Sequence, residues 1–432
     1  MKKLVLVLLA GMMVQLADAQ RVLSLQQCVD TALQRNRNVK QQAIARQARR
    51  IDYEQARQNL LPNLNASVSQ NYTFGRSLTA DNTYQSANSS RSSFSISSSV
   101  TLFDGLRMKY NIDARLADVN ASEAELAKIR KDIELNVTVA YLQALMYKEN
   151  ELTARNQTAM SELKIEQKKI LVDAGKVPEG ELFELKAQLA REELSLTQAS
   201  NNYQLALLDL AQIIELEDYQ NLDVELPAEL MDSELTLLPE GSNLDLVLQN
   251  RPEMQAARYR LNSIEKNVDI ARSALYPTLS MGAQMGTGYY NLQGTVNKPF
   301  EKQMGDNLSS GVGLSVQIPV FNKFEVKNRI SGSKLAVENS KLEMENVRMQ
   351  LRKNIQQAYQ SALAAQSRLK AARKSEEASR EAYRYAEQKY ESGRATVYEL
   401  YQAKTNLAQV ISELSQAKYE LTLRIKAIEL LQ

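Results

Sequence analysis

The chain of 432 residues contains one pattern written twice, and this duplication limits the folds that it can adopt. Self-similarity over so long a period indicates two copies of one structural unit. We expect a first repeat over residues 20–226 and a second of the same design over residues 227–432. The matching segments include Leu60-Leu61-Pro62 with Leu275-Tyr276-Pro277, and Ala140-Tyr141 with Ala358-Tyr359.

Each copy opens with a helical pattern, over residues 25–60 and 244–275, which stops at Pro62 or Pro277 because proline cannot continue a helix. The hydrophobic period then changes from about 3.6 to 2, which indicates strands. Each copy holds two such strands of roughly ten residues, joined by a polar loop at about residues 75–91 and 291–307. Every copy is therefore expected to contain a helix followed by a β-hairpin.

The strand before residue 103 has one mostly apolar face and one hydroxyl face, because successive side chains of a strand point to opposite sides. Its length and alternation are typical of a transmembrane barrel strand. Four strands cannot close a sheet, so closure requires other subunits. A soluble β-sandwich is the alternative. We assign Phe94, Ile96, Val100 and Leu102 to a lipid-facing side, and Ser95, Ser97 and Ser99 to a side that faces a water-filled lumen.

A very long helix follows each hairpin, over residues 108–174 and 324–392, and each is roughly 100 Å long at 1.5 Å per residue. Apolar side chains from Leu126 to Tyr147 recur at spacings of three and four, which is the seam of a coiled coil. Gly175 and Gly393 end these helices. Return helices are expected over residues 181–214 and 397–431.

The N-terminal residues predict export of the chain. Lys2 and Lys3 precede a short apolar run that ends at Ala17-Asp18-Ala19, a pattern typical of a signal peptide over residues 1–19. The formal net charge of +2 predicts no nucleic-acid partner. The lone Cys28 cannot form an intrachain disulfide and is expected to be a buried apolar residue of the first helix.

The composition argues against an enzyme. The chain has no histidine, which is the commonest general base and the commonest metal ligand, so we expect no catalytic residues, no cofactor and no metal site. Carboxylate-only hydrolases stay formally open. The acidic residues, however, lie among similar numbers of Lys and Arg along the helices, as on solvated helix faces.

These features together resemble the TolC family of outer-membrane efflux channels over essentially the whole chain after residue 19. The resemblance rests on the order of the two copies and on short motifs: Pro62, Pro277, Leu102-Phe103-Asp104-Gly105, and Tyr390-Glu391-Ser392-Gly393 followed by Glu399-Leu400 and Ala403. It implies an α+β membrane protein, a homotrimer whose twelve strands form an outer-membrane β-barrel continued by a long α-helical coiled-coil barrel in the periplasm. It also implies two partners, a periplasmic adaptor and an inner-membrane pump.

The implied function is a passive conduit in an efflux or type I secretion system, in contact with outer-membrane lipid. The alternative is a structural periplasmic coiled-coil adaptor without a pore. Two departures from the family pattern concern the turns. Phe321-Asn322-Lys323 replaces an acidic residue and glycine, and Gln402 replaces one of two acids near the tip, which thins any acidic ring there.

The segments where the long helices turn back are the expected periplasmic aperture. There Gly175 and Gly393 act as C-caps and can also serve as hinges. Charge pairs between neighbouring helix pairs are expected to hold the aperture closed. The gating candidates are Tyr390, Gly393, Arg394 and Glu399 in one copy, and Gly175, Lys176, Glu181 and Glu184 in the other. The aromatic residues at the strand ends are expected to form interfacial girdles, with Tyr72, Phe74, Tyr289 and Tyr290 at the loop ends.

Overall fold

The computed structural model describes residues 21–78, 82–217, 219–225 and 244–431. The predicted signal peptide and the predicted boundary between the repeats lie outside these residues, so both remain predictions. The chain forms two compact units, and each draws on both halves of the sequence. One unit contains the chain up to Ala43, Glu125–Met254 and the chain from Val347, and the other contains Ile44–Ala124 and Gln255–Asn346.

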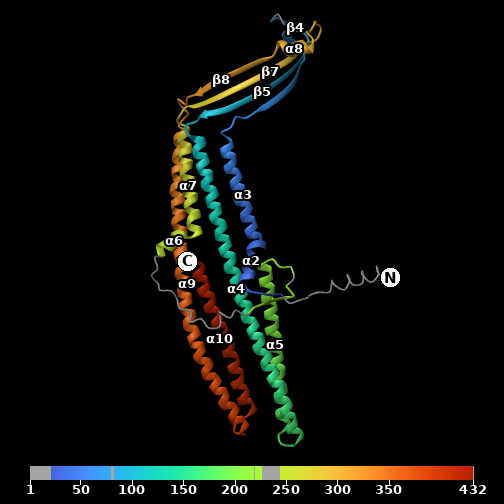
Figure 1. The fold of residues 1–432 in the computed structure, drawn as a ribbon, viewed down its shortest axis with the longest axis vertical. Coiled ribbons are helices and arrows are strands. Elements are labelled where there is room, and N and C mark those ends of the chain that lie inside the picture. The colour runs from blue at the N-terminus through green and yellow to red at the C-terminus, as the bar shows by residue number, and fades with distance from the viewer. Residues whose placement is uncertain (1–20, 79–81, 218, 226–243, 432) are drawn as a thin grey trace, which may run out of the picture. The chain divides into compact units, whose positions relative to one another are not determined.

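The second unit holds a four-stranded antiparallel sheet in the order β2-β5-β7-β8 (Figure 1). The strands are β2 (Asn65–Thr73), β5 (Ser89–Phe103), β7 (Thr278–Leu292) and β8 (Ser309–Gln317). The two predicted hairpins are present, and they join through the pairing of β5 with β7. The last strand stops before Pro319, which has no N–H to donate to a ladder.

The two edge strands are staggered along the central pair. Through β5, strand β2 lies along residues 284–292 of β7, because Asn65 pairs with Ser97 and Ser97 pairs with Gln284. Strand β8 lies along residues 278–286 of the same strand. The edge strands therefore overlap along only a short stretch of β7, and the sheet is a slanted ribbon.

The loops at the far end of the strands are folded. The first contains the small hairpin β3 (Arg76–Leu78) and β4 (Tyr84–Ser86), and the second contains helix α8 (Phe300–Asp306). Where β8 ends, side-chain amides take its place along β7. Gln303 bonds both the N–H and the C=O of Tyr290, Asn297 does the same for Leu292, and Asn307 donates to the carbonyl of Gly288.

The helices of this unit pack through alanine. Four helices each contribute a part to it: α3 (Arg37–Gln58), α7 (Pro252–Ser273), α4 (Arg107–Asp173) and α9 (Glu325–Glu391). On α4 the buried side chains recur at spacings of three and four, at Ala114, Ala117, Ala121 and Ala124. Small side chains at this period allow two helices to approach closely along a narrow seam.

The long helices and their return helices agree closely with the sequence prediction. The return helices are α5 (Glu179–Ile213) and α10 (Val397–Leu431). The predicted opening helices, however, are each broken in two, and this prediction was wrong. Asn36 ends α2 (Leu25–Arg35) with an extended backbone, and Arg251 separates α6 (Leu244–Asn250) from α7 because the residue before Pro252 avoids the helical region.

The main core of the first unit joins α4, α5 and the N-terminal segment. Leu126, Ile133, Val137 and Ala144, which belong to the predicted coiled-coil seam, are buried there. Cys28 is also fully buried, as expected, and burial raises the pKa of its thiol to about 12.

A two-stranded parallel clasp closes this core, and the sequence analysis did not predict it. Strand β1 (Arg21–Leu23) pairs with β6 (Leu222–Val224). Asp223 accepts hydrogen bonds from the ammonium of Lys148 at 2.6 Å, from the hydroxyl of Tyr203, and from the N–H of Val224 at 2.8 Å. Burial by itself would raise the pKa of Asp223, but these hydrogen bonds outweigh it and hold the pKa below its ordinary value.

We expect Asp223→Asn to destabilise the first unit by about 1–3 kcal/mol at neutral pH, because Lys148 and Tyr203 lose a charged acceptor. A depressed carboxyl pKa stabilises the fold above the unfolded-state pKa, and that contribution is lost as pH falls through the folded-state pKa. The difference in unfolding free energy between the parent and the variant should therefore become smaller below about pH 4. Thermal unfolding across pH tests this. Asp306→Asn, which removes an exposed loop ion pair, is the matched control and should leave the unfolding temperature unchanged.

Candidate functional sites: the two faces of the sheet and the helix tips

The register of the sheet separates its side chains onto two faces, because paired residues of neighbouring strands point to the same side. On one face, Phe94 lies opposite Val68, Ile96 opposite Met285, and Val100 opposite Met281, which pairs in turn with Leu314. Many side chains of this apolar face are exposed in the single chain: those at half exposure or more include Val68, Ile96, Val312, Leu314 and Val316.

The other face is hydroxyl and amide. Ser95, Ser97 and Ser99 lie opposite Gly286, Gln284 and Gly282. Ser67 and Ser95 share a hydrogen bond of 2.7 Å, and Asn63 accepts from both the N–H and the hydroxyl of Ser99. The polar face therefore offers hydrogen-bonding groups along the whole width of the sheet.

The register of the sheet changes the predicted placement of two side chains, Leu102 and Tyr290. A β-bulge between Thr101 and Phe103 leaves Leu102 opposite no residue of β7, and Phe103 pairs with Leu279 in its place. Tyr289 and Tyr290 are adjacent and so point to opposite faces. Tyr290 lies on the polar face, where its hydroxyl donates to the carbonyl of Leu78 at 2.8 Å, and so it does not share the girdle face with Tyr289.

Each long helix ends at its tip in the same glycine motif. Gly175 and Gly393 have φ of +68° and +69°, a left-handed conformation that glycine adopts without strain. The next N–H reaches back five residues, from Lys176 to the carbonyl of Leu171 and from Arg394 to that of Lys389. The predicted role of both glycines as helix C-caps is confirmed.

Only some of the predicted aperture residues meet within the chain. The hydroxyl of Tyr390 donates to Glu181 at 3.3 Å, and Lys168 forms an ion pair with the same carboxylate at 2.9 Å. The Lys168 ammonium also lies 4.9 Å from the centre of the Tyr390 ring. Among the residues that the structure describes, the side chains of Lys176, Glu184, Arg394 and Glu399 are exposed and have no ionic partner.

A second link lies one helical turn away on the same faces. Lys164 of α4 pairs with Glu387 of α9 at 2.9 Å, and Tyr383 donates to the same oxygen of Glu387 at 3.0 Å. Burial opposes the charge of Lys164, but the hydrogen bonds to Glu387 and Tyr383 outweigh it and raise the pKa of Lys164. The hydrogen bond from Lys164 lowers the pKa of Glu387. This pair is therefore ionised across the neutral pH range.

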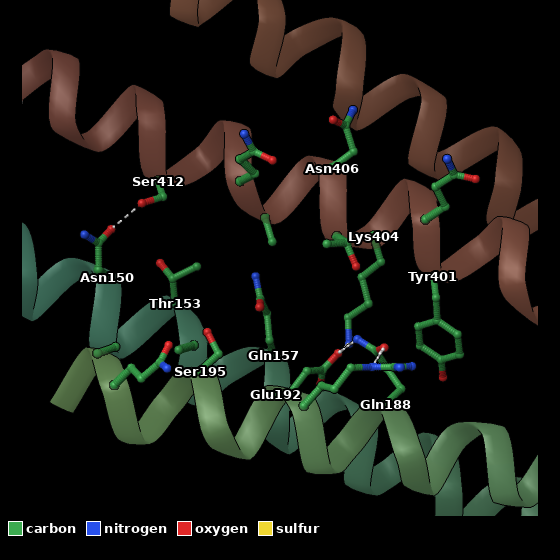
Figure 2. Close-up of a pocket in the computed structure, with 18 of the residues that line it drawn as sticks. Asn150, Thr153, Gln157, Gln188, Glu192, Ser195, Tyr401, Lys404, Asn406 and Ser412 are labelled. Atoms are coloured by element: carbon green, nitrogen blue, oxygen red, sulfur yellow. Dashed lines mark hydrogen bonds and ion pairs between the residues drawn. The ribbon is translucent and has the colours of Figure 1, made fainter. Parts of the chain in front are cut away.

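A third link is buried in a polar groove between α4, α5 and α10 (Figure 2). Lys404 of α10 reaches Glu192 of α5 at 2.8 Å and the hydroxyl of Ser161 of α4 at 2.7 Å. The groove has a volume of about 820 Å³ and is lined largely by amide and hydroxyl side chains. Figure 2 shows Gln188 beside Glu192, to which its amide donates at 3.1 Å. Burial raises the pKa of Tyr401, in the same groove, to about 12.

Tyr390 and Glu181 are among the predicted aperture residues, but Lys168, Lys164, Glu387, Lys404 and Glu192 are not, although one signal for the first three was present. Lys164 and Lys168 are four residues apart, and Tyr383, Glu387 and Tyr390 are spaced by four and three. Such spacings place side chains on one face of a helix. Local spacing indicates a shared face, but it does not indicate which helix that face meets.

A sheet with one apolar and one polar face, on a chain dominated by two long helical hairpins, defines the class of outer-membrane channel subunits. The sequence matches the family described as outer membrane efflux protein over residues 28–214 and 243–431. The chain belongs to this family, and it is an outer-membrane protein with a channel role.

Two curated relatives are similar over most of the chain. The pyoverdine export outer membrane protein OpmQ of Pseudomonas putida is 26% identical over 80% of this chain and 70% of its own length. Protein CyaE of Bordetella pertussis is 24% identical over 74% of this chain and 67% of its own length.

Solved structures share the fold at lower identity. The outer membrane protein VceC from Vibrio cholerae has a TM-score of 0.75 at 17% identity, over 94% of this chain and 95% of that chain. The Campylobacter jejuni CmeC outer membrane channel has a TM-score of 0.78 at 20% identity, over 94% of this chain and 85% of that chain. The family is one of transporters and gives no support to the hydrolase alternative. Among the described residues, none of the helices has both the length and the apolar character that a membrane-spanning helix requires.

Proposed function

We propose that three copies of this chain assemble into one channel, in which twelve strands form an outer-membrane barrel and the long helices form a periplasmic tunnel. The channel is a passive conduit of an efflux or type I secretion system. A periplasmic adaptor and an inner-membrane pump deliver the solute. The observation that carries this proposal is the four-stranded sheet, whose outer strands β2 and β8 pair with no further strand within the described residues.

The stagger of the edge strands supports closure into a barrel. Strands in a closed barrel tilt against its axis, and this tilt requires the register to shift steadily from strand to strand. The sheet has such a shift, because β2 and β8 lie along opposite ends of β7. A second copy can continue the slant by pairing its β2 with the open edge of β8.

The contrast between the two faces supports an aqueous lumen. Exposed apolar side chains on one face of an uncovered sheet are unfavourable in water and favourable against lipid. Serine, glycine and glutamine on the opposite face suit contact with water. In this assignment, Phe94, Ile96 and Val100 face lipid, and Ser95, Ser97 and Ser99 line the lumen.

The links between helix pairs support a closed resting aperture. Tyr390 with Glu181, and Lys164 with Glu387, hold one helical hairpin of a chain to the other. The exposed Arg394 and Glu399 are free to contact a neighbouring copy. Exposed ion pairs contribute only about 0.5–1 kcal/mol each, so a partner of modest differential affinity can release them.

The first prediction of this proposal concerns the number of chains in the assembly. The detergent-purified complex should have the mass of three chains, because a barrel with an aqueous lumen needs more than eight strands. Native mass spectrometry or light scattering with detergent correction measures this. A monomer or dimer that still conducts ions would contradict the trimeric barrel.

The second prediction concerns the faces. Val100→Arg should cost about 2–4 kcal/mol if this position lies near the middle of the bilayer, and it should reduce assembly in the outer membrane. The matched control is Ser99→Arg on the adjacent residue, which should assemble and change the single-channel conductance. Equal assembly of the two variants would contradict the assignment of the faces.

The third prediction concerns the aperture. Tyr390→Phe combined with Glu387→Gln removes links within the chain, and Arg394→Ala combined with Glu399→Ala removes candidates for links between chains. Single-channel recording should show longer or larger openings for both double variants, since each loses stabilisation of the closed state. Openings identical to those of the parent in both cases would rule out polar links as the means of closure.

A further inference from the structure

The four strands of the large sheet, all within the described part of the chain, contain a single charged residue. This residue is Arg91 of β5. A single cation on strands that are otherwise uncharged contributes strongly to the electrostatic potential there, because no described residue forms an ion pair with it.

The register puts Arg91 on the polar face. It lies opposite Asn71 of β2 and Tyr290 of β7, and it shares a face with Ser93 and Ser95, two and four residues further along β5. Its side chain is exposed. It is therefore on the side of the sheet that bears hydroxyl groups, near the end of the strands where α8 and the β3–β4 hairpin fold (Figure 1).

The guanidinium of Arg91 is held over this face by an aromatic ring. It lies 5.4 Å from the centre of the Tyr290 ring. Tyr290 is itself fixed, because its hydroxyl donates to Leu78 and its backbone N–H and C=O are both bonded by the amide of the buried Gln303. A cation–π contact holds the charge in place without neutralising it.

No carboxylate faces this guanidinium among the described residues. In the part of the chain that the structure describes, the side chain of Arg91 forms no ion pair and no hydrogen bond. A hollow of about 630 Å³ beside it, between β5, β7 and α8, is lined by Arg91 and otherwise by neutral residues, including Ser93 and Ser95. The nearby loop charges Lys298 and Asp306 pair with each other at 2.8 Å.

We propose that Arg91 makes the outer end of the barrel attractive to anions, so that carboxylate- or phosphate-bearing solutes are concentrated there relative to cations. This inference rests on the proposed function, in which the polar face lines the lumen and three copies of Arg91 surround it. The arginine then acts as a determinant of solute charge selectivity at the outer end of the conduit.

The test measures the local potential with charged thiol reagents. Ser93→Cys places a thiol on the polar face beside Arg91, and the only native cysteine, Cys28, is fully buried. The assembled protein is treated with an anionic and a cationic methanethiosulfonate. The ratio of the anionic to the cationic reaction rate should fall about three- to tenfold when Arg91→Gln is added. Arg91→Lys should restore most of the ratio.

Two matched controls locate the effect. Ser99→Cys lies on the same face eight residues from Arg91, roughly 26 Å along the strand, which is beyond the Debye length of about 8 Å at physiological salt. At Ser99→Cys, the ratio of the anionic to the cationic reaction rate should change less than twofold when Arg91→Gln is added. Arg76→Gln removes another arginine at the same end of the sheet, which stacks on Tyr84, and it should change the ratio at Ser93→Cys less than Arg91→Gln does.

The outcomes separate the two proposals. If neither cysteine reacts in the assembled protein, the polar face does not line water, and the proposed function fails together with this inference. If both cysteines react and the ratio at Ser93→Cys does not respond to Arg91→Gln, the channel stands and the inference about Arg91 is wrong.

Discussion

The backbone groups at the edges of the four-stranded sheet are the constraint on which the rest of the structure depends. In lipid an unpaired N–H or C=O has no water to bond, so every strand edge needs a partner. The chain meets this need internally where β8 is too short, because Asn297, Gln303 and Asn307 bond the end of β7 in place of a strand. The outer edges of β2 and β8 have no such cover among the described residues. The three amides that cover one partial edge, beside two edges left open, support the proposal that β2 and β8 pair with copies of the chain.

In the helices, close packing and polar links between side chains have separate roles. The seams are narrow and rich in alanine, so helices approach closely but bury little apolar area to fix one hairpin against the other. Long polar side chains supply that specificity. The buried pair of Lys404 and Glu192 is the clearest case, because breaking it would leave a charge without a partner in a site with little solvent. The links near the tips are only partly buried, so we expect each of them to be weaker.

The sequence predicted the elements better than it predicted their contacts. The bounds of the long helices were predictable because Gly175 and Gly393 must adopt a positive φ, and the strand faces were predictable because alternation has a period of two. The break at Asn36 was missed because asparagine is compatible with a helix interior, and its side chain here bonds a residue far away in sequence, Ile213. The clasp of β1 with β6 was missed because three residues carry no periodic signal. Tyr390 and Glu181 were predicted at the tips, but their pairing and the lysines beside them were missed, because each link joins two helices whose mutual register no local pattern encodes.

The duplication also explains why the two copies are not interchangeable. Their backbones are alike, since Gly105 and Lys323 both have positive φ at the turn into the long helix. Their side chains differ according to local space. A Cβ at Gly105 would lie 2.7 Å from the carbonyl oxygen of Ser273, so only glycine fits there.

The two copies also differ in the side chains that they contribute to the links between them near the tips: one supplies the lysines and the other supplies Glu387. The first copy supplies Lys164 and Lys168, and the second has alanine at both matching positions, 382 and 386. The second copy supplies Tyr383 and Glu387 in return. A hairpin of one kind therefore finds its complement on a hairpin of the other kind, because two second-copy hairpins would set Glu387 against alanine and would lack the lysine that pairs with it. In the proposed trimer, this complementarity favours alternation of the two kinds of hairpin around the helical barrel.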